Sequence, residues 1–395
     1  MKLNSKGEFD DSIKLSKKAF ILSGFEIGEP KYYFMKWLYY FNVLWLYTDV
    51  FGEFSWLAEG MRLGKGLDEL SMVAPCSTIS LLGTAKILPF FLNKQTFQKA
   101  VQKLRSIHPD KEESENVDRK IVIDSQRCLK SVTTFFSFAA LVVVVIFSCE
   151  PCMLMGYEYY NTGDVKLMLP FLVKYFFDAY ANTTIWSFVY VHQVWSTVIV
   201  CVFLFAADTL FYAFCTYLRM HFRILGHQFK NVVSLSPEET RKNMRNCVKK
   251  HQELANLLEI LYSKSTLFNI ISSSVLLCLS GFNIVVRTGT VLKFAPFLVM
   301  SLTQVFLLCF FGDLLMSSSI QISDAVYSCR WYDVHYIHKH TYLMLFLKTR
   351  SQKPCKVTAS NFADLNLSAF TTVSMALFSA TRTVRTRMRF CVRRG

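Results

Sequence analysis

Long apolar stretches separated by charged connections form the main pattern along this chain. Each stretch is close to the roughly 20 residues that an α-helix needs to cross the hydrocarbon core of a bilayer. The pattern therefore predicts seven membrane-spanning helices, of which the last is much weaker than the others. They cover residues 32–51, 70–93, 132–156, 194–218, 265–285, 294–317 and 365–380.

Composition agrees with this pattern. Hydrophobic residues make up 52% of the chain and charged residues only 18%, whereas a soluble domain has about a quarter of its residues charged. The twelve cysteines fall mostly inside apolar windows, which favours buried thiols over a secreted disulfide framework. The chain is therefore predicted to be an all-α polytopic membrane protein, a seven-transmembrane helical bundle in the lipid bilayer.

The charges between the spans predict their orientation. The N-terminal segment 1–31 and every second connection after it contain 30 Lys and Arg residues, and the other connections contain six. Cytoplasmic loops of membrane proteins carry the excess of Lys and Arg, so we expect a cytoplasmic N-terminus. The net charge of +15 then reflects topology, and no nucleic-acid partner is expected.

Two glycosylation triplets test this orientation. Asn182-Thr183-Thr184 lies in the connection 157–193, which the charges place outside the cell, where Asn182 can be glycosylated. Asn366-Leu367-Ser368 lies at an expected inner membrane edge and should stay unmodified.

One stretch combines a span with a polar continuation. Residues 301–332 contain Gln304 and Asp313 and continue without Gly or Pro, after Gly312, to the pair Trp331-Tyr332. An acidic group at the end of a span usually meets water or other helices, because hydrocarbon solvates it poorly. We interpret this stretch as a span whose helix continues into the cytoplasm.

A second inner helix is predicted after residue 236. Ser236 suits the cap, Pro237 the first helical position and Glu239 the third position after the cap. An apolar stripe then recurs at helical spacing. It is interpreted as a packing face; continuation of the fifth span and binding of partner helices stay open. The stripe consists of Met244, Val248, His251, Leu254, Leu258 and Leu261.

No catalytic, cofactor or metal site is expected. His335, His338 and His340 have spacing compatible with a metal, but no supporting cluster accompanies them. Cys149 and Cys152 form a CxxC pair without the second pair that a zinc site normally needs. No phosphate-binding loop, nucleophile elbow or HExxH motif occurs, so an enzyme is improbable.

Several short motifs together resemble the insect odorant receptor family. The match spans about residues 30–375, and its outer connection looks like receptors from moths and butterflies. The motifs on the inner side are Phe311-Gly312-Asp313, Ser317 to Ser319, Ala325, Tyr327, Trp331-Tyr332, residues 350–354, Thr358-Ala359-Ser360 and residues 361–365. Those of the outer connection are Leu169-Pro170-Phe171, residues 177–180 and residues 188–195.

The resemblance implies a function that composition could not supply. Receptors of this family form odorant-gated, non-selective cation channels as hetero-oligomers with a shared odorant co-receptor, in the plasma membrane of olfactory sensory neurons. Their inner helices form an anchor region that holds the subunits together. A small volatile odorant or pheromone binds in the outer half of the bundle, and the last span lines the pore.

The resemblance also projects functional residues onto this chain, although each could equally serve ordinary helix packing. Aromatic and Met side chains suit an apolar ligand. The expected pore-lining residues are Phe370, Thr371 and Met375. The expected ligand-binding residues are Thr78, Leu82, Phe147, Met153, Trp195, Ile199, Phe297 and Met300.

The C-terminus departs from the family pattern, which has an apolar pore helix here. Residues 365–380 are short for a span, and the tail 381–395 is rich in Arg, which would then lie outside against the charge trend. An altered reading frame, a splice variant or a degenerating gene would explain this tail; a thinned bilayer around a short span is the alternative. We therefore expect a segment 1–31, a receptor domain 32–380 and an atypical tail.

Three other functional classes are weighed against a working receptor. A G-protein-coupled receptor would need its N-terminus outside the cell. A secondary transporter would usually show paired, Gly- or Pro-broken spans from an internal duplication, and the sequence shows no such repeat. A pseudoreceptor of the same family would assemble or bind odorant without conducting.

Overall fold

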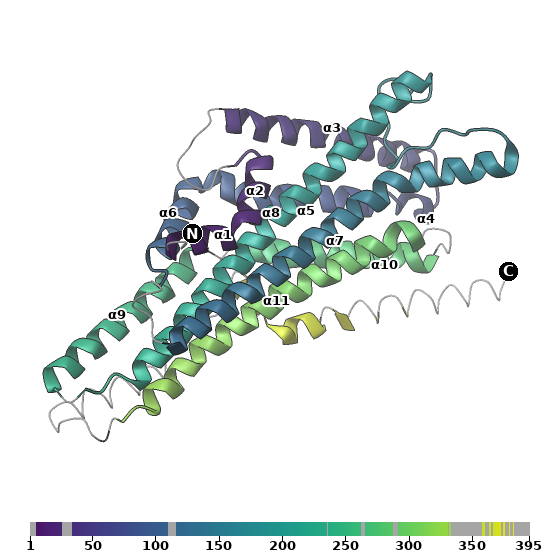
Figure 1. The fold of residues 1–395 in the computed structure, drawn as a ribbon. Coiled ribbons are helices and arrows are strands. Elements are labelled where there is room, and N and C mark those ends of the chain that lie inside the picture. Colours follow the sequence, from purple (N-terminus) through teal and green to yellow (C-terminus); the bar gives the residue numbers. More distant parts are fainter. Residues whose placement is uncertain are drawn as a thin grey trace.

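The structure, a computed structural model, is a bundle of long helices (Figure 1). It describes residues 5–25, 34–109, 116–234, 236–261, 265–286, 291–330 and 332, and shorter pieces at 358–359, 363–364, 366–372, 374–375, 379 and 382.

The helices follow one another along the chain. They are α1 (Ser5–Ser12), α2 (Lys14–Leu22), α3 (Phe34–Arg62), α4 (Leu67–Leu70), α5 (Ala74–Leu92), α6 (Lys94–Ser106), α7 (Asn116–Thr162), α8 (Thr183–Lys230), α9 (Pro237–Leu261), α10 (Ser265–Val286) and α11 (Val291–Tyr327). The strands β1 (Thr358–Ala359) and β2 (Ala363–Asp364) form an antiparallel pair that the sequence did not predict. The predicted all-α class is confirmed, apart from this small addition.

The predicted spans correspond to these helices. Four described helices are long and apolar enough to cross a membrane, namely α5, α7, α8 and residues 294–327 of α11, and α10 holds a shorter apolar segment at 271–285. Helix α3 covers the first predicted span, and several polar residues lie among its apolar ones. Of the predicted seventh span, residues 366–372, 374–375 and 379 are described, and these are helical from 367 onward.

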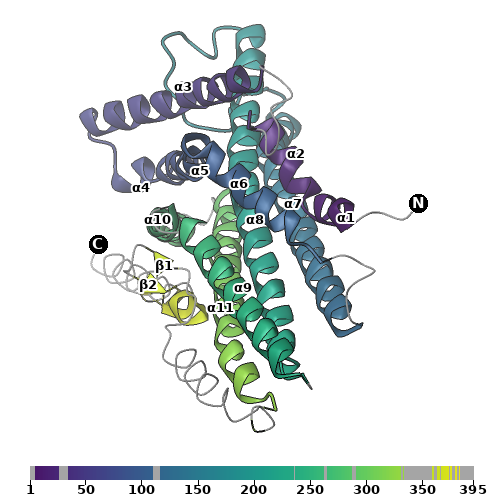
Figure 2. The ribbon, with the colours of Figure 1, turned by 90° about the vertical axis from the view of Figure 1, so that its left-hand side faces the viewer.

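Three helices extend well beyond a bilayer. Helices α7, α8 and α11 contain 47, 48 and 37 residues, and they run side by side (Figures 1 and 2). The helix predicted to continue through residues 301–332 is confirmed as far as Tyr327, where α11 ends. At the other end of the bundle, α3 crosses α8 close to the loop 163–182 between α7 and α8 (Figure 2).

Helix α8 forms the centre of the bundle. It contacts α2, α3, α5, α7, α9 and α11. Large side chains on all its sides are buried, among them Phe203, Tyr212, Tyr217 and Phe222. A helix that is apolar all round is buried in the core of a large protein or within a membrane, which explains its central position.

The N-terminal segment is packed into this core. Phe9 and Phe20 are almost completely buried, and the Phe9 ring lies 4.8 Å from the Tyr217 ring of α8. The hydroxyl groups of Ser12 and Tyr217 are hydrogen-bonded, and Asp10 pairs with Arg105 of α6 at 2.6 Å. Segment 1–31 therefore contributes packed helices, so its described part is not a free tail.

Helix α9 begins where the sequence predicted. Its first residue is Pro237, and on its apolar stripe Met244 and Leu254 are buried while Val248 is partly buried. Because α9 contacts α8 and α6, the stripe is a packing face within this chain. Leu258 and Leu261 belong to the predicted stripe, but their side chains lie outside the described part of the structure.

A buried ion pair joins three helices at mid-bundle. Lys86 of α5 donates to both oxygens of Asp208 of α8, at 2.7 and 3.0 Å, and both side chains are almost fully buried. Gln304 of α11 donates to Oδ2 of the same carboxylate. A buried carboxylate needs such partners because the surrounding helices solvate charge poorly. Gln304, the polar residue noted within the predicted span, therefore provides a hydrogen-bond donor to the buried Asp208 carboxylate.

Removal of Lys86 should destabilise the bundle strongly. The substitution Lys86→Met leaves Asp208 charged and uncompensated, which costs about 3–5 kcal/mol. We expect a lower melting temperature of the purified chain and less protein at the cell surface. The double variant Lys86→Met with Asp208→Asn should recover most of the loss, because the neutral amide can still accept from Gln304.

The matched control is Lys99→Met, which removes an exposed Lys of the neighbouring helix α6. A Lys86→Met chain as stable as the control, or a double variant as unstable as the single one, would contradict the role given to this pair.

Candidate functional site

The loop 163–182 folds over the end of the bundle and is fastened to α8. The backbone N–H of Phe171 donates to Oε1 of Gln193 at 2.9 Å, and Nε2 of Gln193 lies 3.4 Å from the Phe171 carbonyl. The indole N–H of Trp186 donates to the carbonyl of Met168 at 3.1 Å. Gln193 is completely buried, so an amide inside the bundle holds the backbone of the loop.

The same loop is fastened to α3. Tyr175 donates its hydroxyl proton to Oδ1 of Asp49 at 2.9 Å, and the N–H of Lys174 donates to the carbonyl of Gly52 at 3.1 Å. Burial, together with the Asp49 carboxylate, raises the pKa of Tyr175. The phenol therefore stays protonated and keeps donating to Asp49.

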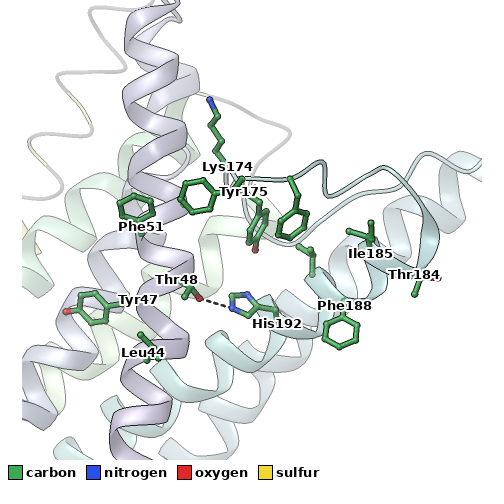
Figure 3. A pocket seen from close by; sticks show the side chains of 14 residues that line it. Leu44, Tyr47, Thr48, Phe51, Lys174, Tyr175, Thr184, Ile185, Phe188 and His192 are labelled. Carbon is green, nitrogen blue, oxygen red and sulfur yellow. Dashed lines mark hydrogen bonds between the residues drawn. The ribbon is translucent and has the colours of Figure 1, made fainter.

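A large apolar pocket lies under this loop, between α3 and the start of α8, and we call it the loop pocket (Figure 3). Its volume is about 800 Å³. Thr48 and His192 are hydrogen-bonded on one wall at 2.9 Å. Half of the other lining residues are aromatic, namely Tyr47, Phe51, Tyr175, Phe176, Phe177 and Phe188.

A second, much smaller hollow lies deeper in the bundle, and we call it the inner cavity. It is enclosed by α3, α5, α7, α8 and α11 and covered by Phe171 of the loop. The Phe147 ring lies 5.9 Å from the Phe171 ring and 4.4 Å from the Phe297 ring. Its lining is Leu46, Asp49, Glu53, Cys76, Ile79, Ser80, Val143, Phe147, Phe171, Ser196, Thr197, Val200, Cys201 and Phe297.

Hydrogen-bonded side chains separate the two spaces. Asp49 lines the inner cavity, whereas Tyr175 and His192 line the loop pocket. Tyr175 donates to Asp49, and Nδ1 of His192 lies 3.1 Å from the same oxygen. We call Asp49, Tyr175 and His192 the partition. Asp49 is only 4% exposed, and its second oxygen, Oδ2, has no hydrogen-bond partner among the described residues.

The volumes distinguish what each space can hold. The inner cavity has a volume of about 40 Å³, enough for a water-sized body, whereas sites for small organic ligands measure about 300–1,000 Å³. The inner cavity is therefore closed in this conformation. A ligand could occupy it only after the partition or the surrounding helices had moved.

Metal chemistry finds no support in the described residues. They contain no group of three or more His, Cys, Asp or Glu that could hold a metal ion. The cysteines of the CxxC pair, Cys149 and Cys152, are exposed thiols. The predicted candidates His335, His338 and His340 lie outside the described residues.

Comparison with protein families assigns the chain. Residues 66–377, most of its length, match the family model of the seven-transmembrane odorant receptors. The chain belongs to the odorant receptor family. This receptor is 26% identical to odorant receptor 67c of Drosophila melanogaster over 87% of its own length and 85% of that protein. It is 25% identical to the putative odorant receptor 92a of the same species, over 85% and 84% of the two chains.

Solved structures show the same fold. The olfactory receptor OR5 from Machilis hrabei superposes with a TM-score of 0.77 at 14% identity, over 95% of this chain and 98% of that one. The complex of OR5 with eugenol gives a TM-score of 0.72. The resemblance found in the sequence is thus confirmed, and this is a family of receptors, not enzymes.

The residues expected to bind ligand occupy several environments in the receptor. Phe147 and Phe297 line the inner cavity, and Leu82 and Ile199 are buried in the core. Met300 is partly buried. It packs against the main hydrophobic core of the bundle and against the smaller buried cluster that contains Phe147 and Phe297.

Three further predicted residues point elsewhere. Thr78 donates its hydroxyl to the Ala74 carbonyl one turn earlier. Met153 and Trp195 are 57% and 43% exposed in the single chain. A ligand role for each of these residues stays a prediction.

Asn182, the expected glycosylation site, is the N-cap of α8. Its Oδ1 accepts from the N–H of Ile185 at 2.8 Å, and its side chain is exposed. An exposed position at a helix start is open to modification, and modification itself stays a prediction.

Sequence reasoning missed the acidic residues of α3. Asp49 and Glu53 lie one turn apart, and both are only 4% exposed. Acidic residues within a predicted span are rare and usually functional. The same rule that marks Asp313 also marks Asp49, which lies within the first predicted span. Tyr175 and His192 gave no comparable signal, because only the folded loop brings Tyr175 to Asp49 and only the packing of α8 against α3 brings His192 there.

Close contact between α3 and the loop predicts the effect of one added methyl group. A Cβ at Gly52 would lie 2.2 Å from Cγ1 of Val173, so Gly52→Ala must displace the loop. We expect faster hydrogen–deuterium exchange in residues 163–182 of the purified chain. Val173→Ala removes the clashing atom, and the double variant should restore most of the protection.

Gly156→Ala is the matched control, because a Cβ there meets nothing within 4 Å in the described part of the chain. Exchange that is unchanged by Gly52→Ala, or increased equally by Gly156→Ala, would contradict the docked position of the loop.

Proposed function

We propose that this odorant receptor is the ligand-sensing subunit of an odorant-gated, non-selective cation channel, formed with an odorant co-receptor. The inner cavity carries the proposal. It is enclosed by helices that meet around Phe147 and Phe297, and it is covered by a fastened loop. Most of its lining residues are apolar or Cys, with hydroxyl and carboxyl groups among them, a combination that suits a small organic ligand.

Ligand binding would act by population shift. The closed inner cavity is too small for an odorant, so the ligand binds better to a conformation in which the cavity is wider. A ligand shifts an equilibrium only through such differential affinity. We infer that the wider conformation is also the one in which the pore opens.

Helix α11 offers a direct connection from the cavity to the expected pore. Phe297 lines the cavity, and Phe306 lies nine residues further along, about 14 Å at the rise of an α-helix. The Phe306 ring contacts the ring of Phe370 at 5.4 Å. Phe370, Thr371 and Met375 are the proposed pore-lining residues, so movement of α11 at the cavity would reach them.

The proposed setting is the plasma membrane of olfactory sensory neurons, with segment 1–31 in the cytoplasm and residues 32–380 as the receptor domain. A second candidate is a pseudoreceptor that assembles or binds odorant but does not conduct. The tail 381–395 favours it, because its Arg residues replace the end of the apolar pore helix that the family pattern implies.

Currents in cells that express this chain with the co-receptor test the channel. We expect odorant-evoked cation current that is absent from cells expressing either chain alone. A chimera whose residues after 365 come from a family-like seventh span is the parallel measurement. Current from the chimera alone would establish the pseudoreceptor, and silence from both at normal surface levels would contradict the channel assignment.

Glycosylation tests the proposed topology. We expect an endoglycosidase to increase the gel mobility of the native chain, and Asn182→Asp to abolish that shift. Asp keeps a side-chain oxygen at the position that caps α8 but cannot be glycosylated. Thr184→Ser preserves the triplet and should keep the shift. An N-terminal tag that antibodies reach without permeabilisation would overturn the cytoplasmic N-terminus.

A further inference from the structure

The hydroxyl groups that line the inner cavity have already donated their protons. Ser80 donates to the carbonyl of Cys76 at 3.1 Å, Ser196 to that of His192 at 3.1 Å, and Thr197 to that of Gln193 at 3.0 Å. Each bond returns to the hydroxyl's own helix, one turn earlier. A hydroxyl has one proton and two lone pairs, so these groups can only accept from a bound molecule.

The two acids of the cavity also accept. Ser77 donates to Oε2 of Glu53 at 2.7 Å, and Tyr175 donates to Oδ1 of Asp49 at 2.9 Å. Oδ2 of Asp49 finds no partner within the described part of the chain, although Asp49 lines the cavity and is 4% exposed. An acceptor buried without a partner is costly, and a ligand could satisfy this one.

The charges around the cavity leave this acceptor uncompensated. No Lys or Arg is among the described residues that line the inner cavity, and Lys86 is already bound to Asp208. The basic group in contact with Asp49 is His192, at 3.1 Å. Around the inner cavity, two acids therefore lie near one imidazole.

We propose that the ligand of this receptor is a small, largely apolar molecule whose polar group donates hydrogen bonds, an alcohol or an amine, which Asp49 Oδ2 accepts. The proposal rests on the proposed function and names its ligand class. Apart from the weak thiol donors of Cys76 and Cys201, the described wall offers lone pairs. An aldehyde, ketone or ether would place its own lone pairs against them.

The apolar part of such a ligand has a matching surface. Val143, Phe147 and Phe297, which line the cavity, belong to one buried hydrophobic cluster. Phenylalanine rings also attract an ammonium group through their faces. An amine would therefore gain at both walls, whereas an alcohol would gain from Asp49 and from apolar burial.

Two measurements on the full chain test the ligand class. Heptanol, heptylamine, heptanal and methyl hexyl ether have similar size and differ in their donors. Thermal stabilisation of the purified receptor reports binding without conduction, and current in cells with the co-receptor reports gating. We expect heptanol or heptylamine to act at concentrations at least about tenfold lower than heptanal and the ether, since one buried hydrogen bond contributes about that factor.

Asp49→Asn distinguishes recognition from general damage. Asn keeps the size of the side chain and accepts with one oxygen, but it adds two donors and removes the negative charge. We expect the variant to lose the preference for donors, most of all for the amine, and to respond better to heptanal. Asp124→Asn, which neutralises an exposed acid of α7, should keep the native order.

The outcomes separate this inference from the proposed function. Heptanal or the ether acting as well as heptanol and heptylamine would overturn the ligand class while leaving a working receptor. An unchanged donor preference in a folded Asp49→Asn chain would overturn the role of Asp49. Binding of donors without any current would support the inference and contradict the channel. No response of either kind, across a wider set of matched donor and acceptor pairs, would overturn both.

Discussion

A carboxylate inside an apolar helical bundle must be met by donors or by a cation, and the two levels of this bundle meet that requirement differently. At mid-bundle, Lys86 and Gln304 satisfy Asp208, so α5, α8 and α11 are joined by a compensated charge. Nearer the loop, Oδ1 of Asp49 accepts a hydrogen bond from the Tyr175 hydroxyl, while Oδ2 has no partner among the residues that the structure describes. The first arrangement fixes the helices relative to one another. The second leaves a carboxyl oxygen beside a cavity that can still accept a hydrogen bond.

Under the proposed function, this difference links stability to ligand sensing. The loop 163–182 is attached to α3 and α8 through Asp49, which lines the inner cavity, and Gln193, which holds the Phe171 that covers it. A molecule that binds Asp49 therefore acts on the group that fastens the loop. It also contacts Phe297 of α11, the helix that carries Phe306 toward Phe370. Recognition and movement would thus share a few side chains, and the mid-bundle ion pair would hold the helices around which they move.

Much of the fold was predictable from the sequence, because bilayer-length apolar stretches and helix caps are local signals. The start of α9 at Pro237 and the continuous helix through residues 301–327 were predicted in this way. The site was less accessible. Phe147 and Phe297 came from a family resemblance and do line the inner cavity. Tyr175 reaches Asp49, 126 residues earlier in the sequence, only because the loop folds back. His192 of α8 reaches Asp49 only because α3 packs against α8, and no periodic pattern encodes either contact.

The central claim is that a ligand occupies the inner cavity, and two native cysteines allow a direct measurement. Cys76 and Cys201 line that cavity, whereas Cys278 of α10 is exposed and is not among the described lining residues. The purified receptor would be treated with a small apolar thiol reagent, with and without heptanol or heptylamine, whichever stabilises it, and labelling would be read by mass spectrometry. We predict that the ligand slows labelling of Cys201 and Cys76 and leaves Cys278 unchanged. Equal labelling of Cys201 with and without a stabilising ligand would contradict the account.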